Sequence, residues 1–376
     1  MLYWFAPYLT ELWGPFRLFG SHLMLLAAGT LVAGFVIWWF FPKCWHLMPQ
    51  DRGKDKILAP DGDKSIGRPT GTGMLLSLLV LPIVVLCVPL RLPEYGILLC
   101  LYLCMAFGYF DDKSKLPWGE MKKGLLDLLV AVIAASLIYG IQGGGLWMPF
   151  TTREFVLPAW LYIPTASLLL WFTINATNCS DGIDGLAGML TLFSLFALGA
   201  LLYGVVGYFP VAEYLRIPHN PAGARWAILL AIYAGALAGY LWYNAETSRV
   251  LMGDAGSRLF GMLVGVAVLV AGNLFLIFVV APVVIFNGGT GLFKLIFLRM
   301  LRRVGFDVRP PSKLGEKEAL EQHIIVKALH SIRFPLHDHC RYNLKDSWSN
   351  AQILMRFTLI QAFLTPILFV ILIKIR

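Results

Sequence analysis

The fold class is decided by residues 95–115, YGILLCLYLCMAFGYFDDKSK, where a long apolar run ends abruptly at two neighbouring aspartates. A helix needs about 20 predominantly apolar residues to cross the hydrocarbon core of a bilayer. Runs of this kind recur along the 376-residue chain, which is 58% hydrophobic and only 14% charged. Soluble domains carry about 25% charged residues. The sequence therefore predicts an all-α polytopic integral membrane protein embedded in a lipid bilayer.

We predict about ten transmembrane helices in a single transmembrane domain, residues 1–376. The expected spans are 22–42, 70–92, 95–110, 124–142, 158–174, 186–206, 226–243, 257–271, 274–298 and 353–373. The division of residues 257–298 stays open. The first 20 residues lack the cationic region and cleavage site of a signal peptide, so we expect an interfacial aromatic segment there.

Lysine and arginine predict the orientation of these spans. Five loops fall on one side of the membrane, approximately 43–69, 111–123, 174–185, 244–258 and 299–352. Together with the start of the last span they hold 23 of the 31 basic residues. Basic residues concentrate in cytoplasmic loops, so we expect these loops in the cytoplasm and both termini outside. The net charge is +9, and we expect the basic residues to attract anionic lipid headgroups or an anionic substrate. We expect no nucleic-acid partner.

Five aspartates lie at the predicted cytoplasmic ends of the spans. Asp111 and Asp112 lie near the end of residues 95–115. Asp181 and Asp184 lie in NATNCSDGIDGLAG, and Asp254 lies in MGDAGS. Carboxylates at the edge of hydrocarbon are costly and usually mark an ion, substrate or proton site. Their common side predicts one polar site on the cytoplasmic face.

Each acidic motif also has a structural alternative. Asp111 and Asp112 could pair with the lysines that follow them. Asp181 could cap a helix that begins near Ser180, although capping does not explain the dense polar cluster that Asn175 and Asn178 add. GDAGS alone would suit many turns, but at a helix start its unpaired N–H groups could bind a phosphate.

Two further segments carry polar features inside or beside the last spans. In FPLHDHC, His337 and His339 could contact a metal or phosphate, but no spacing suggests structural zinc. A polar helix is expected over Lys313–Arg333. The glycine-rich stretch Phe286–Gly291 predicts either a bend or close helix packing, and both interpretations stay open.

The cytoplasmic groups are rich in oxygen, and lysines lie nearby. Mg²⁺ takes one or two carboxylates plus substrate phosphates, and Lys and Mg²⁺ neutralise charge during phosphoryl transfer. The pattern therefore favours an enzyme that joins a soluble diphosphate to a lipid phosphate. The absence of Walker, G-x-S-x-G and H-E-x-x-H motifs argues against ATPases, hydrolases and zinc proteases.

FGYFDDKSK, NATNCSDGIDGLAG, MGDAGS and PLHDH occur in the order and spacing of the polyprenyl-phosphate N-acetylhexosamine-1-phosphate transferases. Within that superfamily the chain most resembles the MraY-type phospho-N-acetylmuramoyl-pentapeptide-transferases. The resemblance implies transfer of phospho-MurNAc-pentapeptide from UDP-MurNAc-pentapeptide to undecaprenyl phosphate, which forms lipid I and releases UMP. It also implies Mg²⁺ as cofactor and a multi-pass location in the bacterial cytoplasmic (inner) membrane. There the reaction is the first membrane step of the peptidoglycan synthesis that supports cell shape and division.

The resemblance assigns roles to residues of this chain. The implied catalytic residues are Asp111, Asp112, Asp254 and His337. Asp254 and Asp184 are the implied metal ligands, with Asp254 leading. The implied substrate-binding residues are Lys64, Lys115, Lys123, Asn178, Asp181, Asp184, Asn244 and His339. Among them, the resemblance places Asn178 and Asn244 on the nucleotide side.

The chain departs from the family pattern at several positions. Asp338 replaces the middle histidine of a triplet, and RPTGTG replaces TPTMGG with its lysine displaced to Lys64. Leu251 replaces a stacking aromatic, and the segment at Asn287 lacks a usual glutamate. Two other functions remain in play, a sister transferase that uses UDP-GlcNAc and an ion- or proton-coupled transporter. Transporters place carboxylates near the bilayer midplane, often within inverted repeats, so this sequence favours the enzyme. The oligomeric state stays open, with a homodimer as one option.

Overall fold

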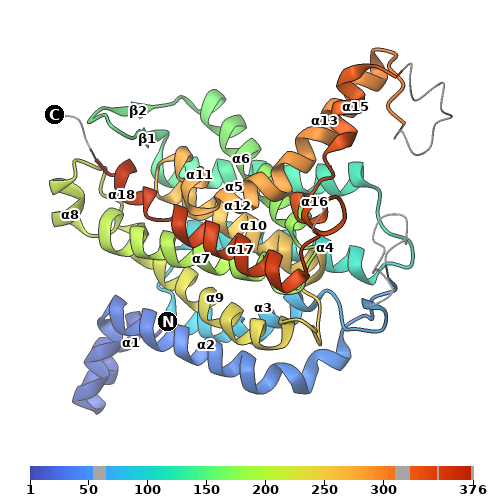
Figure 1. Cartoon of the computed structure of the whole chain (residues 1–376). Coiled ribbons are helices and arrows are strands. Elements are labelled where there is room, and N and C mark those ends of the chain that lie inside the picture. The colour runs from blue at the N-terminus through green and yellow to red at the C-terminus, as the bar shows by residue number, and fades with distance from the viewer. Residues whose placement is uncertain (54–64, 310–321, 345–346, 374–376) are drawn as a thin grey trace.

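The computed structural model describes residues 1–53, 65–309, 322–344 and 347–373, which form a bundle of helices (Figure 1). The α-helices are α1 (Leu2–Leu12), α2 (His22–Cys44), α3 (Thr72–Cys87), α4 (Leu92–Lys113), α5 (Glu120–Gln142), α6 (Ala159–Ser180), α7 (Leu186–Leu201), α8 (Phe209–Tyr214), α9 (Ala222–Asn244), α10 (Gly253–Val270), α11 (Ile277–Val280), α12 (Pro282–Val284), α13 (Thr290–Arg303), α15 (Ile324–Ser331), α16 (Leu336–Tyr342), α17 (Asn350–Leu364) and α18 (Ile367–Ile371). Short 3₁₀-helices are η1 (Gly14–Gly20), η2 (Trp45–Leu47) and η5 (Leu274–Leu276), and π-helices are η4 (Leu202–Val206) and η6 (Ile285–Gly289).

The described part of the chain holds nine helical stretches long and apolar enough to cross a membrane. A tenth apolar helix, α3, has 16 residues and is shorter than the others. The all-α polytopic class is thereby confirmed. Which end of the bundle faces the cytoplasm, and where the termini lie, stay predictions.

Helix α10 forms the centre of the bundle. Every residue of this helix from Ala255 to Val270 is buried, and it packs against α3, α4, α6 and α7. Without a hydrophobic driving force between helices in lipid, membrane helices associate through close packing of small residues. The glycines and alanines of GDAGSRLFGMLVGVAVLV serve that packing. The acidic start of α10 is therefore fixed by helices on several sides.

The two ends of the bundle carry different connections (Figure 1). One end holds α8, α18 and an antiparallel hairpin of β1 (Gly145–Trp147) and β2 (Glu154–Val156), in which Leu146 pairs with Phe155. The hairpin is joined to the bundle by the Trp147 N–H, which donates to the Gly272 carbonyl at 2.9 Å. No pattern in the sequence had indicated this hairpin. The other end holds α15, α16 and the acidic ends of the spans.

The predicted span 274–298 was wrong as a single helix. The chain there runs through η5, α11, α12, the π-helix η6 and α13, with Pro282 at the first position of α12. A proline lacks the N–H that a helix interior needs. At Gly288, an added Cβ would overlap the carbonyl oxygen of Ala176 on α6. The glycine-rich stretch therefore combines both expected features, an irregular helix and close packing.

Three other boundaries also differ from the sequence prediction. Helix α6 continues to Ser180, so Asp181 ends a helix instead of capping the next one. The last predicted span is divided into α17 and α18 before Pro366. In the described part of the expected helix Lys313–Arg333, α15 covers Ile324–Ser331 only. The six cysteines are free, and Cys100 and Cys104 are buried packing residues as expected.

Candidate active site

Helix α4 reaches the start of α10 because Gly108 has no side chain. A Cβ at Gly108 would overlap the backbone carbonyl of Asp254. One turn beyond this contact α4 carries Asp111 and Asp112, so both carboxylates arrive beside the first turn of α10. The sequence separation between these segments is about 140 residues, and helix packing alone joins them.

Asp112 accepts hydrogen bonds from the first turn of α10. Its Oδ1 lies 3.2 Å from the Asp254 amide nitrogen, and its Oδ2 lies 3.1 Å from the Ala255 amide nitrogen. The first N–H groups of a helix have no partner within that helix, and a carboxylate near them is favourable. These two N–H groups are thus occupied by Asp112. Contrary to the expectation, the N–H groups of Asp254 and Ala255 are therefore not available to a phosphate.

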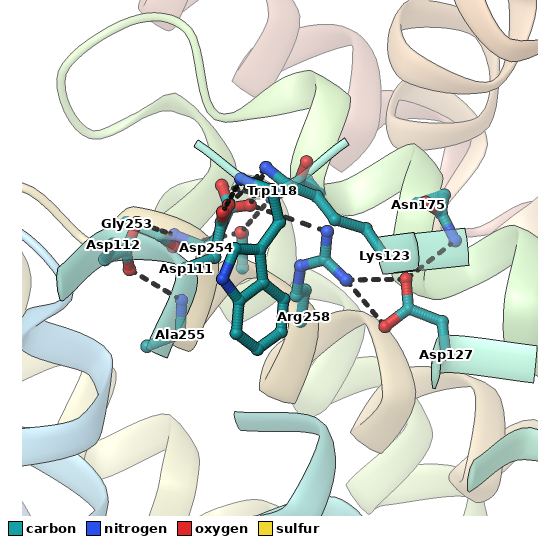
Figure 2. Close-up of polar contacts among 12 residues, drawn as sticks. Asp111, Asp112, Trp118, Lys123, Asp127, Asn175, Gly253, Asp254, Ala255 and Arg258 are labelled. Carbon is teal, nitrogen blue, oxygen red and sulfur yellow. Dashed lines mark hydrogen bonds and ion pairs between the residues drawn. The ribbon is translucent and has the colours of Figure 1, made fainter. Parts of the chain in front are cut away.

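Asp111 and Asp254 share the ammonium group of Lys123, which lies in the first turns of α5 (Figure 2). Lys123 Nζ contacts Asp111 Oδ2 and lies 3.1 Å from Asp254 Oδ2. Asp111 Oδ1 also accepts from the Trp118 amide at 2.6 Å. The side chains of Lys123 and Asp254 are 21% and 24% exposed, so a ligand can reach them. This acidic pair with its lysine, the Asp111–Lys123–Asp254 cluster, joins three helices.

Asn178 fixes the other oxygen of Asp254. Its amide nitrogen donates to Asp254 Oδ1 at 2.9 Å and to Ser257 Oγ at 2.9 Å. Asn178 was expected near a nucleotide, and the structure places it against the leading metal-ligand candidate. Asp181, three residues later, is the half-buried residue at the end of α6.

Sequence reasoning missed a buried ion pair behind Asp254. Arg258 Nη1 lies 2.6 Å from both carboxylate oxygens of Asp127 on α5, and Arg258 Nη2 lies 3.5 Å from Asp254 Oδ2 (Figure 2). Asn175 of α6 donates to Asp127 at 3.3 Å. A signal existed in the sequence, since a lone Asp and a lone Arg each interrupt an apolar run. Arg258 was counted as a loop residue, but it lies inside α10.

Asp184 belongs to a second cluster. Arg68 Nη1 lies 3.3 Å from Asp184 Oδ2 and donates to Ser248 Oγ at 2.9 Å, while the Ser248 amide donates to Asp184 at 3.0 Å. Sequence reasoning did not single out Arg68 for this position. The structure therefore does not join Asp184, the second predicted metal ligand, to Asp254 through any hydrogen bond or ion pair in the described residues.

Asn244 is buried beside this second cluster. Its side-chain oxygen accepts from the Gly185 amide at 2.9 Å, and its side-chain nitrogen donates to the Val250 carbonyl at 2.8 Å. The side-chain amide of Asn244 thus holds the loops after α6 and α9 together. A nucleotide contact by Asn244 stays a prediction.

His337 lies on the short helix α16 and is buried, unlike a solvated loop histidine. Its backbone N–H donates to Asn287 Oδ1 at 2.9 Å, and its ring Nδ1 lies 3.1 Å from the same oxygen. His337 Nε2 lies 3.7 Å from Asp338 Oδ1. His339, two residues on, is half-buried and its Nδ1 accepts from the Arg333 amide at 3.3 Å. Asn287 is a contact that sequence reasoning did not assign.

The remaining predicted lysines differ in position. Lys115 is exposed between α4 and α5, where its carbonyl accepts from Arg52 at 2.8 Å. Lys64 lies outside the described residues. Lys122, next to Lys123, instead stacks its ammonium on the Trp118 ring at 3.5 Å.

The carboxylates of the cluster suit a Mg²⁺ ion that also binds substrate. No group of three or more His, Cys, Asp or Glu side chains in the described ranges forms a ready metal cage. In phosphate-handling sites, however, Mg²⁺ is held by one or two carboxylates plus substrate phosphates. Asp111 and Asp254 are the candidate carboxylates for such an ion, since an oxygen of each reaches the same cation, the Lys123 ammonium.

Comparison with known proteins identifies the family of this chain. Residues 95–272, which span α4 to α10, match the family described as glycosyl transferase family 4. The phospho-N-acetylmuramoyl-pentapeptide-transferases of two strains of Treponema pallidum, one of them the Nichols strain, are each 39% identical over 373 residues. These alignments cover 98% of this chain and 95% of the relative. The enzyme of that name from Bartonella quintana is 27% identical over 349 residues, 90% of each chain. This chain therefore belongs to the phospho-N-acetylmuramoyl-pentapeptide-transferase family.

Proposed function

We propose that this chain transfers phospho-MurNAc-pentapeptide from UDP-MurNAc-pentapeptide to undecaprenyl phosphate, forming lipid I and releasing UMP. The observation that carries the proposal is the Asp111–Lys123–Asp254 cluster, set at the ends of three membrane-spanning helices. A water-soluble diphosphate and a lipid phosphate can meet only where the bundle touches both phases. The relatives' shared name supports the same choice.

The cluster suits phosphoryl transfer because it combines fixed positive charge with an acidic cradle. Phosphoryl transfer depends on positioning and on neutralising charge at the moving group. The Lys123 ammonium is half-buried between two carboxylates, which hold it at the site before substrate arrives. Asp254 is fixed through both oxygens, by Asn178 on one side and by Lys123 and Arg258 on the other.

In the proposed reaction an oxygen of the lipid phosphate attacks the sugar-side phosphorus of the UDP-sugar. A new P–O bond forms, the bridging P–O bond of the diphosphate breaks, and its electron pair leaves with UMP. Asp111 orients the lipid phosphate and accepts any proton that the lipid phosphate carries. Bound Mg²⁺, held by Asp254 with Asp111 beside it, would supply charge neutralisation at the diphosphate. Lys123 adds a second positive charge there.

His337 takes a supporting part on the proposed substrate side. The Asn287 oxygen already accepts from the His337 backbone N–H, so it acts as an acceptor toward Nδ1 as well. Nδ1 then carries a ring proton, while Nε2 lies toward the Asp338 carboxylate. We place the Asp184–Arg68 cluster and Asn244 on the nucleotide side, and the acidic end of the bundle on the cytoplasmic face.

The test is UMP release by the purified full chain in lipid nanodiscs. The assay supplies Mg²⁺, undecaprenyl phosphate and either UDP-MurNAc-pentapeptide or UDP-GlcNAc. UMP release with UDP-MurNAc-pentapeptide, with a lipid-linked product, supports the proposal. Release with UDP-GlcNAc alone would overturn it in favour of the sister transferases. Release of UMP without any lipid-linked product would also count against it.

A further inference from the structure

The ion pair between Asp127 and Arg258 has features that packing alone does not explain. The two side chains are 0% and 4% exposed and lie inside helices α5 and α10. Charged groups within a membrane are expensive, and those that persist usually serve a function. A buried pair gives little net stability over apolar residues of similar size. The pair therefore calls for a role beyond holding the two helices together.

The geometry directs this pair toward Asp254. Arg258 lies one helical turn after Asp254 on α10, and its Nη2 lies 3.5 Å from Asp254 Oδ2. The same oxygen receives the Lys123 ammonium at 3.1 Å. Arg258 Nε is buried without a hydrogen-bond partner among the described residues, so Asp127 holds the guanidinium by one nitrogen. A second nitrogen of the guanidinium is thereby aimed at the acidic site.

The charge balance of the region depends on Arg258. Four carboxylates, those of Asp111, Asp112, Asp127 and Asp254, are linked by the contacts described above, and Lys123 and Arg258 are the cations within them. Because Arg258 Nη1 contacts both carboxylate oxygens of Asp127 at 2.6 Å, that arginine is only partly available to Asp254. A buried cation at 3.5 Å from a carboxylate oxygen opposes the approach of a second cation to that carboxylate.

We propose that the Asp127–Arg258 pair is a positioning device that adjusts how strongly Asp254 binds a divalent cation. Arg258 acts as a built-in counter-charge for Asp254, and Asp127 limits how far the guanidinium can turn toward that carboxylate. The proposal rests on the proposed function for its catalytic consequence, but its effect on cation binding does not need substrate. Arg258 and Asp127 are positioning residues, since they act through Asp254 and not on the reacting groups.

The two halves of the pair make opposite predictions. Arg258→Leu removes the counter-charge and is expected to tighten Mn²⁺ binding at least about threefold. Asp127→Asn frees the guanidinium for Asp254 and is expected to weaken Mn²⁺ binding at least about threefold. A merely structural pair would move both variants in the same direction, because both break the same contact.

Further variants separate this role from loss of folding. Asp127→Leu/Arg258→Leu replaces the buried charges by apolar groups and should tighten Mn²⁺ binding as Arg258→Leu does. Adding Asp254→Asn should remove the difference between Arg258→Leu and the unchanged protein. The matched control is a second ion pair of low exposure, Glu94 with Arg225, which are 1% and 12% exposed. Glu94→Leu/Arg225→Leu should leave Mn²⁺ binding as it is.

The experiment measures free Mn²⁺ by electron paramagnetic resonance, with the full-length protein in nanodiscs and no substrate. A parallel series measures the Mg²⁺ concentration that gives half-maximal UMP release. Opposite shifts for Arg258→Leu and Asp127→Asn in the Mn²⁺ measurement support the proposal. Shifts in the same direction, or none, overturn it, as does an equal shift for the Glu94/Arg225 control. If the unchanged protein releases no UMP, the proposed function fails while the Mn²⁺ series still decides the role of Arg258.

Discussion

Asp112 on α4 holds the backbone of Asp254 on α10, with its Oδ1 3.2 Å from the Asp254 amide nitrogen. The neighbouring carboxylate, Asp111, instead faces the Lys123 ammonium. Two adjacent aspartates thus do different work. One fixes the helix that carries Asp254, and the other lies in the cluster that we propose as the reacting site.

Asp112→Ala should therefore lower both stability and activity. Loss of a helix cap costs about 1 kcal/mol, and here the uncapped turn carries Asp254. We expect a lower thermal midpoint in nanodiscs and slower UMP release. Ser349→Ala, which removes the cap of α17, is the control. It should lower the midpoint similarly and leave UMP release intact. Unchanged release by Asp112→Ala would contradict the capping role.

Lys123 and Lys122 provide a matched pair of variants. Lys123→Met removes the ammonium shared by Asp111 and Asp254 and should reduce turnover about 100-fold, as loss of one preorganised charge-stabilising group does. Lys122→Met removes only the contact with the Trp118 ring. Initial rates of UMP release compare them. Similar losses of turnover in both variants would contradict a specific role of the Lys123 ammonium in the reaction.

Asn287→Ala should slow turnover by releasing the orientation of His337. The variant removes the acceptor of the His337 N–H and of its ring Nδ1. The control is Asn273→Ala. Asn273 is another fully buried asparagine, and its side chain caps η5, just beyond the end of α10 opposite Asp254. Nitrogen NMR of labelled histidine should show the Nδ1–H form in the unchanged protein. An Nε2–H form, or equal rates for both variants, would refute the assignment.

Gly108→Ala should separate α4 from α10. An added Cβ would overlap the Asp254 carbonyl, and overpacking of this kind typically costs about 1–3 kcal/mol. Both the thermal midpoint and UMP release should fall. At Gly140 of α5 an added Cβ meets no atom within 4 Å. Gly140→Ala should therefore keep activity and a midpoint at least equal to that of the unchanged protein. A Gly108→Ala variant with full activity would show that the close contact is dispensable.

The sequence predicted the elements of this molecule better than the contacts between them. The membrane spans and the aspartates at their ends could be predicted because spanning length and the cost of membrane carboxylates are local properties. The irregular helix near Pro282 and Gly288 could be predicted in part. The hydrogen bonds from the start of α10 to Asp112 could not be predicted, since they depend on the packing of Gly108 against α10. Arg68 and Asp184 are 116 residues apart, and nothing in either motif indicates the other.

The most direct measurement of the cluster's role is UMP release by Asp254→Asn and Asp111→Asn with UDP-MurNAc-pentapeptide, undecaprenyl phosphate and Mg²⁺. Each variant keeps the size and most hydrogen bonds of the side chain but loses the charge that faces Lys123. We expect both to lose at least about 100-fold in turnover while they still insert and purify as the unchanged protein does. Turnover by Asp254→Asn within about threefold of the unchanged protein would contradict the assignment of the Asp111–Lys123–Asp254 cluster as the reacting site.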